Sequence, residues 1–424
     1  MSGDEVETGS AGNAEGPGPQ DGSAPATRAS GPRFVSNADK LGYSPPLDGM
    51  RGLAVSLIVL VHASFVPFAS FAGTVDMFFV VSGFLITTLL LEEDRRSGRV
   101  NMKRFYTRRA LRLLPLMYVV LAGTLLAFVA VHLLFDERAL LDRAISDVLA
   151  GATYMSHVVH PVHIELVGGG PPPIRPLIQL WSLTVEEHFY LFGTLVILLV
   201  VRRRWVTQLM VLFTAAWIFI GIARFNGHVG PVFAWYQRPD SLLLGVVLAF
   251  VNARMPAQLS QNGARWLQRA ANVAIVVGLA TVFVGLAPAK LVGVHVPFLV
   301  PEGGSLRDGL YWGEFGFTIV AACLAVVVIT FARYPEFWAA RAMSNKVLTT
   351  LGVRSYAIYL IHVPLGVLLM ETLGRKAPAV ALLIYLPLLA LLVEGAHRFI
   401  EKPAMRLKFR FSEPDASGAT SRFT

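Results

Sequence analysis

The sequence predicts an all-α protein, folded as a polytopic transmembrane helical bundle of about ten spans. The chain is 54% hydrophobic and only 15% charged, with a mean hydropathy of +0.57, which is too apolar for a soluble protein of 424 residues. Apolar runs near twenty residues recur along it, and about 20 residues are needed to cross ~30 Å of hydrocarbon. The runs are continuous rather than alternating, which favours helices over a β-barrel.

The apolar runs divide the chain into a membrane domain and two tails. Residues 1–40 are rich in Gly, Ala, Ser, Pro and acidic residues and lack a core, so we expect a disordered cytoplasmic tail. Residues 41–403 form the membrane domain, and 404–424 form a basic cytoplasmic tail. The expected spans are 52–71, 75–91, 112–134, 183–201, 206–222, 238–252, 272–288, 313–331, 351–371 and 379–396.

The basic residues predict the orientation in the membrane. With the N-terminus in the cytoplasm, 28 of the 37 Lys and Arg residues fall on the inner side and nine on the outer side. This asymmetry follows the positive-inside rule and favours an even number of spans. The charge of +9 is then explained by topology and a lipid bilayer rather than by a nucleic-acid partner. We expect a multi-pass protein of the plasma membrane with both termini cytoplasmic.

The longest outer connection runs from about residue 135 to 180 and contains Gly168–Pro173. A long Gly- and Pro-rich outer loop serves either as a functional cover or as a loose connector. The sequence leaves both open.

A metal site is not expected. His157, His160 and His163 lie in that outer loop, but Pro161 prevents a helical turn that would align them. Cys323 is the only cysteine, so the chain can form neither an internal disulfide nor a cluster of thiolate ligands.

The first span carries a cation and a base on one face. Arg51 and His62 are eleven residues apart, which returns to within ~20° of the same helix face and separates them by ~16 Å. Arg51, preceded by Asp48, would lie at the inner membrane edge and His62 near mid-bilayer. A histidine at that depth suggests function, and its ordinary pKa near ~6.5 suits a general base. The alternative is a structural histidine bonded to a neighbouring helix.

A second pair of cations precedes the third span. Arg109 and Arg112, at i and i+3, share one helix face at the predicted inner surface. Guanidinium groups bind phosphates bidentately, so these residues predict an anion site. A stop-transfer cluster would show the same pattern.

Polar groups also occur where three further spans begin on the outer side. Four carboxylates and an arginine could pair there. They are Asp76, Glu186, Glu187, Arg238 and Asp240. Each alone could be an interfacial charge.

The ninth span has a polar face formed by Ser355, Tyr359 and His362, because steps of four and three residues stay on one side of a helix. A polar seam between packed helices is the alternative to a site.

Taken in order, these motifs resemble the acyltransferase-3 family of integral membrane acyltransferases, from about Leu47 to Pro403. The resemblance rests on six motifs: Arg51 with His62; Asp76 with Phe78–Phe84; Arg109 with Arg112; Trp181–Leu183 with Glu186, Glu187, Phe189 and Tyr190; Arg238 with Asp240; and Ser355 with Tyr356, Tyr359 and His362. It implies O-acylation of a carbohydrate-containing acceptor, with acyl-CoA as co-substrate and no tightly bound cofactor. Some members carry a fused esterase-like domain, which this sequence lacks, so we expect a stand-alone member. Such members modify surface glycans, lipid-linked sugars or macrolides and related metabolites.

The residues and the resemblance together suggest a mechanism. Arg51, Arg109 and Arg112 would hold the CoA phosphates, and His62 would take the proton of an acceptor hydroxyl. Glu186 or Glu187 would orient the base or bind the acceptor. The remaining candidate site residues are Asp48, Asp76, Ser82, Tyr190, Arg238, Asp240, Ser355, Tyr359 and His362.

Two functions of other classes compete with this one. A transporter or lipid flippase would use the same polar groups to line a path without covalent chemistry, although no paired repeats are visible. A membrane scaffold or receptor would leave the intramembrane His, Arg and carboxylates unexplained.

Overall fold

The computed structural model describes residues 36–38, 40–62, 73–156, 175–225, 240–285 and 316–410. These residues all fall within one compact unit. They form α-helices interrupted by π-helical turns, and no strand occurs among them. The predicted all-α class is confirmed.

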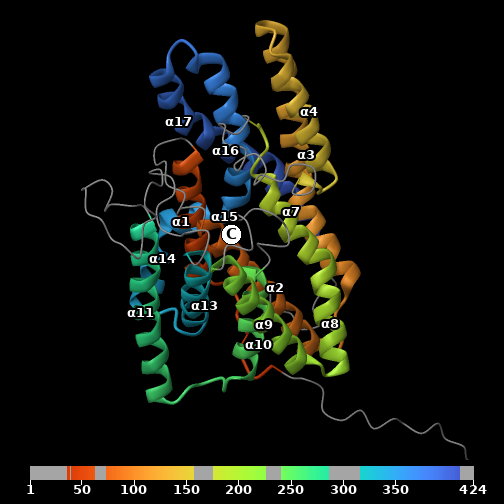
Figure 1. Cartoon of the computed structure of the whole chain (residues 1–424). Coiled ribbons are helices and arrows are strands. Elements are labelled where there is room, and N and C mark those ends of the chain that lie inside the picture. Colours follow the sequence, from red (N-terminus) through yellow and green to blue (C-terminus); the bar gives the residue numbers. More distant parts are fainter. Residues whose placement is uncertain are drawn as a thin grey trace, which may run out of the picture. The chain divides into compact units, whose positions relative to one another are not determined.

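The helices follow one another as shown in Figure 1. The first half contains α1 (Pro45–His62), α2 (Thr74–Ser97), α3 (Met102–Phe135), α4 (Arg138–Ala152), α7 (Leu180–His188), the π-helical turn η2 (Phe189–Gly193), α8 (Thr194–Arg203) and α9 (Val206–Phe225). The second half contains α10 (Asp240–Arg254), α11 (Gln261–Gly285), α13 (Phe317–Arg333), α14 (Trp338–Met343), α15 (Lys346–Val353), α16 (Ser355–Leu369), η6 (Met370–Gly374), α17 (Pro378–Ala396), η7 (His397–Glu401) and α18 (Lys402–Arg410).

Six helices of the described residues are long and apolar enough to cross a membrane, so the protein is a membrane protein of the predicted kind. They are Thr74–Ser97, Met102–Phe135, Leu180–Arg203, Val206–Arg224, Ser355–Gly374 and Pro378–Leu407. Helices α1, α10, α11 and α13 coincide with parts of the other four expected spans, and the count of ten is not confirmed.

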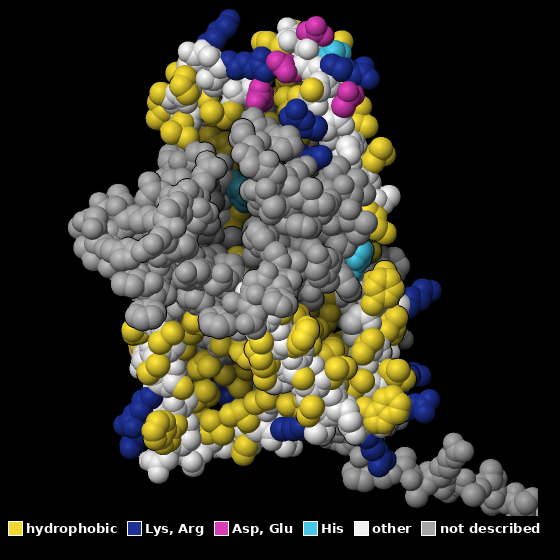
Figure 2. All heavy atoms as spheres, viewed as in Figure 1, with side chains coloured by type: hydrophobic (Ala, Val, Ile, Leu, Met, Phe, Trp, Pro, Cys, Tyr) yellow, Lys and Arg dark blue, Asp and Glu magenta, His cyan; other side chains and the backbone are white. Residues whose placement is uncertain are grey.

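The surface has the pattern of a protein with two polar ends. Figure 2 shows hydrophobic side chains between the ends of the visible face, basic side chains at its lower end, and both acidic and basic side chains at its upper end. The α10–α11 connection, which we predict to be on the inner side, lies at the lower end (Figure 1).

Glycine brings two pairs of helices into backbone contact. A Cβ atom on Gly83 of α2 would overlap the carbonyl of Leu242 on α10, and one on Gly245 of α10 would overlap the carbonyl of Val80. Helix α1 crosses α15 in the same way at Gly52 and Gly352. Small residues at such crossings are typical of membrane helices, because close approach replaces the missing hydrophobic driving force.

Helix α3 lies beside the helix formed by α7, η2 and α8. The hydroxyl of Tyr106 donates to the carbonyl of Leu191 at 2.8 Å and lies 3.0 Å from the hydroxyl of Thr194. Leu191 lies in the π-helical turn η2, which interrupts the regular α-helical hydrogen bonds, and such turns are frequent at functional sites. This pairing sets the height of the polar residues on both helices.

The predicted outer loop begins with a helix that the sequence analysis did not expect. Helix α4 packs back along α3, and its buried Asp147 accepts hydrogen bonds from Arg175 (2.9 Å) and the backbone of Leu177 (3.1 Å). The carboxylate therefore ties α4 to the residues that lead into α7. Gly168–Pro173 lie outside the described residues.

Candidate active site

The cation of α1 lies inside the bundle rather than at its inner edge. Arg51 sits over the ring of Phe78, with 5.9 Å between the guanidinium carbon and the ring centroid. Phe78 is nineteen residues from Ser97, the predicted inner end of α2, which corresponds to ~28 Å of helix. The expected inner-edge position of Arg51 is therefore not observed, because α1 and α2 are offset along their axes.

The three arginines of the predicted donor site lie close together, but they differ in their ion-pair partners. Arg51 lies 4.0 Å from Asp48, and Arg109 lies 3.5 Å from Glu187. Arg112 is exposed and has no hydrogen bond or ion pair in the described part of the chain, although Arg51 and Arg109 are within electrostatic range. Arg112 is thus the arginine best placed to bind an anion.

The four carboxylates form two separate groups, not one. Glu186 accepts hydrogen bonds from the hydroxyls of Ser82 and Tyr190, and adjoins Glu187 beside the cluster of arginines. Tyr190 also lies against the guanidinium of Arg109. The glutamates therefore belong with the cations that we had assigned to the opposite side of the membrane.

Asp76 and Asp240 lie in the second group, where α2, α9 and α10 meet. Asp76 accepts a hydrogen bond from Ser241 at 2.5 Å, and Asp240 binds Arg224 through two hydrogen bonds of 2.8 and 3.0 Å. Arg224 and Asp240 are each only 1% exposed. A buried bidentate pair of this kind orders helix ends. Arg238, the expected partner, lies outside the described residues.

A cavity of about 50 Å³ lies beside the first group. Arg51, Phe78, Ser182, Glu186, Ser355 and Tyr359 are among its lining residues. The hydroxyl of Tyr359 lies 2.6 Å from that of Ser182 and donates to the carbonyl of Gln179. The hydroxyl of Ser355 is buried without a hydrogen-bond partner. The face predicted for the ninth span is thus partly a wall of this cavity.

The two histidines of the site form a pair. His62, at the end of α1, is exposed, whereas His362 on α16 is 1% exposed. Nδ1 of His62 lies 3.1 Å from Nε2 of His362, and their ring centroids are 5.1 Å apart. The ring of His362 also contacts that of Tyr359, with centroids 5.5 Å apart and a tilt of 46°, which joins the pair to the cavity wall.

The partners of His362 assign the hydrogen atoms of both rings. Nδ1 of His362 lies 2.8 Å from the carbonyl of Tyr359 and 3.2 Å from that of Ile358. Carbonyl oxygens only accept, so in the neutral ring Nδ1 carries the hydrogen and Nε2 is an acceptor. His62 then donates from Nδ1, which leaves its Nε2 lone pair available as a base.

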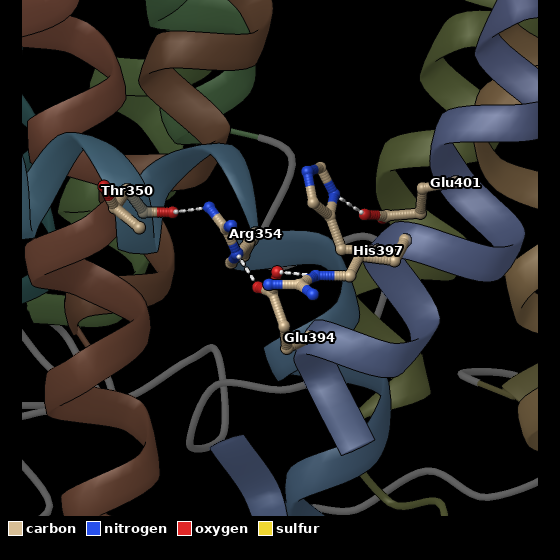
Figure 3. A network of polar contacts seen from close by, with 6 residues as sticks. Thr350, Arg354, Glu394, His397 and Glu401 are labelled. Atoms are coloured by element: carbon tan, nitrogen blue, oxygen red, sulfur yellow. Dashed lines mark hydrogen bonds and ion pairs between the residues drawn. The ribbon is translucent and has the colours of Figure 1, made fainter. Parts of the chain in front are cut away.

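A further polar network lies at the ends of α15 and α17 (Figure 3). Glu394 accepts hydrogen bonds from Arg354 at 2.8 Å and from Arg398 at 2.5 Å, and His397 lies 2.7 Å from Glu401. The sequence predicts that the last span covers 379–396. Instead the helix passes through η7 into α18, so Glu394 and the three residues of this network that follow it lie on one continuous helix. Arg354 joins this helix from the end of α15.

Three polar residues near the site were not among the candidate site residues, although one of them, Ser182, falls within the Trp181–Leu183 motif. Tyr154 follows α4, in a segment that we expected to be a loop, and only its position in space reveals it. Gln179 carries an amide and Ser182 a hydroxyl, and both groups are common wherever helices pack through polar side chains. No signal in a single sequence separates them from structural residues.

Among the described residues, no group of three or more His, Cys, Asp or Glu side chains is placed to hold a metal. His157, His160 and His163 lie outside the described residues.

The fold and the site define a helical membrane protein with a polar interior that holds a histidine pair above a cluster of arginines and glutamates. Residues 46–393 match the acyltransferase-3 family, described as an acyltransferase domain. The match covers most of the chain, and the protein belongs to this family of acyltransferases.

Two relatives illustrate the likeness. The chain is 30% identical over 377 residues to the O-acetyltransferase OatA of Staphylococcus aureus, which covers 87% of this chain and 58% of that protein. It is 29% identical over 382 residues to the peptidoglycan O-acetyltransferase OatA of Listeria monocytogenes, covering 87% and 56%. The chain therefore spans less than three fifths of the length of these relatives. No solved structure matches the chain.

Proposed function

We propose that the protein is a membrane O-acyltransferase that moves an acetyl or other short acyl group from acyl-CoA to a hydroxyl of a carbohydrate-containing acceptor. The observation that carries the proposal is the His62–His362 pair, which leaves the Nε2 atom of an exposed imidazole available inside a membrane bundle. The family and the names of the two relatives support O-acetylation. A surface glycan, a lipid-linked sugar and a glycosylated metabolite are the acceptor classes that we consider.

The arginines supply the electrostatic part of the proposal. CoA carries several phosphates, which cannot enter a bilayer without compensating charge. Arg112 makes no hydrogen bond or ion pair with the described residues, and its neighbours Arg51 and Arg109 add to the positive potential around it. Phosphates held there would leave the flexible pantetheine arm to extend toward His62, which lies ~16 Å along α1 from Arg51.

The chemical step is then a single acyl transfer. The hydroxyl oxygen of the acceptor attacks the thioester carbonyl carbon, a C–O bond forms and the C–S bond breaks. His62 Nε2 takes the hydroxyl proton and passes it to the departing CoA thiolate, so that CoA leaves as a thiol. General base catalysis of this kind contributes roughly 10²–10⁴-fold in rate.

Acyl transfer from labelled acetyl-CoA, measured in purified membranes with peptidoglycan oligosaccharides as acceptors, tests the proposal. We expect His62→Ala to lose about 10²–10⁴-fold in rate. His132→Gln is the control, because His132 lies near the far end of α3, where it is 3.9 Å from Asp136. Full activity in His62→Ala would remove His62 as the base.

The same assay distinguishes an acyltransferase from the competing hypothesis of a transporter or lipid flippase. An acyltransferase consumes acetyl-CoA and transfers label to the glycan. Uptake of a solute by sealed vesicles without any consumption of CoA thioester would instead favour transport. We further propose the plasma membrane as the location, with both termini in the cytoplasm, from the distribution of Lys and Arg.

A further inference from the structure

Three buried polar atoms next to the cluster of arginines have no hydrogen-bond partner. They are Nε of Arg109, Oε1 of Glu187 and the hydroxyl of Tyr154. Glu187 and Arg109 lie 3.5 Å apart, and both act electrostatically on Tyr154. Buried polar groups are nearly always bonded, so unpartnered atoms gathered in one place point to a ligand.

The backbone at Tyr154 is also unusual. Its φ is 55°, in the left-handed region that favours glycine and disfavours a bulky side chain. The turn is held by hydrogen bonds from Tyr154 N to Gly151 O at 3.1 Å and from Met155 N to Ala150 O at 2.7 Å. A glycine would form this turn at lower cost, so the tyrosine side chain itself has a use there.

The charges around these atoms select an uncharged ligand group. The charges of Arg109 and Glu187 offset each other, whereas Arg112 makes no ion pair with the described residues and feels the charge of Asp48 only at longer range. The site offers one N–H donor, one carboxylate acceptor and one hydroxyl that can do both. Amide and hydroxyl groups, which both donate and accept, match this set. A phosphate only accepts and carries negative charge, so it fits Arg112 better.

We propose that Tyr154, Glu187 and Arg109 form a subsite for the uncharged pantetheine arm of the donor, next to the phosphates at Arg112. The assignment rests on the proposed function. Arg109 precedes Arg112 by one turn of α3, a rise of ~4.5 Å, so one extended ligand can reach both. The arm carries a hydroxyl and two amides, which supply the donors and acceptors that the subsite lacks.

The protonation state of the Tyr154 hydroxyl agrees with this role. Burial, and then the charge of Glu187, raises the pKa of Tyr154, so its hydroxyl keeps its proton at neutral pH. It can therefore donate to an amide carbonyl of the arm.

The test measures binding of labelled acetyl-CoA to the purified full-length protein, together with competition by acetyl-pantetheine, which has the arm but no nucleotide. We expect Tyr154→Phe to lower the affinity for both ligands by about threefold to tenfold, which corresponds to the loss of one hydrogen bond. We expect Arg112→Ala to lower the affinity for acetyl-CoA by more than it lowers the affinity for acetyl-pantetheine. Tyr334→Phe is the matched control, because Tyr334 caps the end of α13 and belongs to a different hydrophobic cluster, so both affinities should stay unchanged.

A second variant guards against misfolding. Tyr154→Gly suits the left-handed backbone and removes the whole side chain, so it should weaken both ligands without lowering the melting temperature. Unchanged affinity of Tyr154→Phe for both ligands, with wild-type binding intact, would overturn the subsite and leave the proposed function standing. If Tyr154→Phe instead raised only the KM for the glycan, the proposal would also be overturned, because the subsite would then serve the acceptor. Absence of acetyl-CoA binding by the wild-type protein would overturn both proposals.

Discussion

At the scale of single residues, the two histidines of the site have different surroundings and therefore different roles. His362 is buried and bonded through Nδ1 to backbone carbonyls, so its ring cannot turn freely. His62 is exposed and has its ring held by His362. The buried ring positions the exposed one, and only the exposed ring can meet a substrate.

This difference predicts a graded loss of activity. His362→Leu removes the acceptor of the His62 hydrogen bond, and we expect the rate of acyl transfer to fall roughly 10–100-fold, less than in His62→Ala. His362→Asn keeps an acceptor oxygen and should retain more activity than His362→Leu. Steady-state rates of the three variants measure the order. Equal rates for His362→Leu and the wild type would show that His62 needs no partner.

At the scale of helices, backbone contacts between glycines fix the positions of the polar residues. Ser82 is the neighbour of Gly83, and Ser241 lies one turn before Gly245, so the α2–α10 crossing sets the place of two site hydroxyls. A side chain at either glycine would separate the helices. The hydrogen bonds of Ser82 to Glu186 and of Ser241 to Asp76 depend on this close approach.

We therefore expect Gly245→Ala to destabilise the protein by about 1–3 kcal/mol, the usual cost of overpacking. The added methyl would meet a backbone carbonyl and the backbone nitrogen of Phe84, neither of which can move alone. Gly395→Ala is the control, since nothing lies within 4 Å of its Cβ position. Melting temperatures of the detergent-solubilised variants make the comparison. Equal values would mean that the crossing adapts.

At the scale of the whole molecule, the charged residues predict the orientation in the membrane, and the packing of the helices positions the polar interior. The described bundle contains six helices fit to span a membrane, with connections that differ in charge. The Ser97 end of α2 falls in the basic segment that we predict to be inside. Arg138, at the start of α4, falls on the predicted outer side.

Cysteine labelling tests this orientation. In a Cys323→Ser background, we expect Arg138→Cys to react with a membrane-impermeant maleimide in intact cells, and Ser97→Cys to react only after permeabilisation. Both positions are exposed, so a missing reaction reports the side and not burial. The reverse pattern would place both termini outside.

The candidate site shows which of its parts can be predicted from sequence. The pairing of Arg51 with His62 on one helix face, and of Arg109 with Arg112, follows from spacing alone, because residues close in sequence share one rigid helix. The partners of Asp240 and Glu187 could not be predicted in this way. They depend on how far each helix is shifted along its neighbour, and hydrophobic patterns do not encode that shift.

By itself, the sequence determined that this is an all-α membrane protein, which residues carry its charges, and which of them share a helix face. It did so because span length, composition and periodicity are local properties of the chain. Only the tertiary structure decided that His62 meets His362 across 300 residues, that the glutamates join the arginines, and that α4 brings Tyr154 to them. These contacts arise from backbone packing between distant helices, which no local property of the sequence specifies.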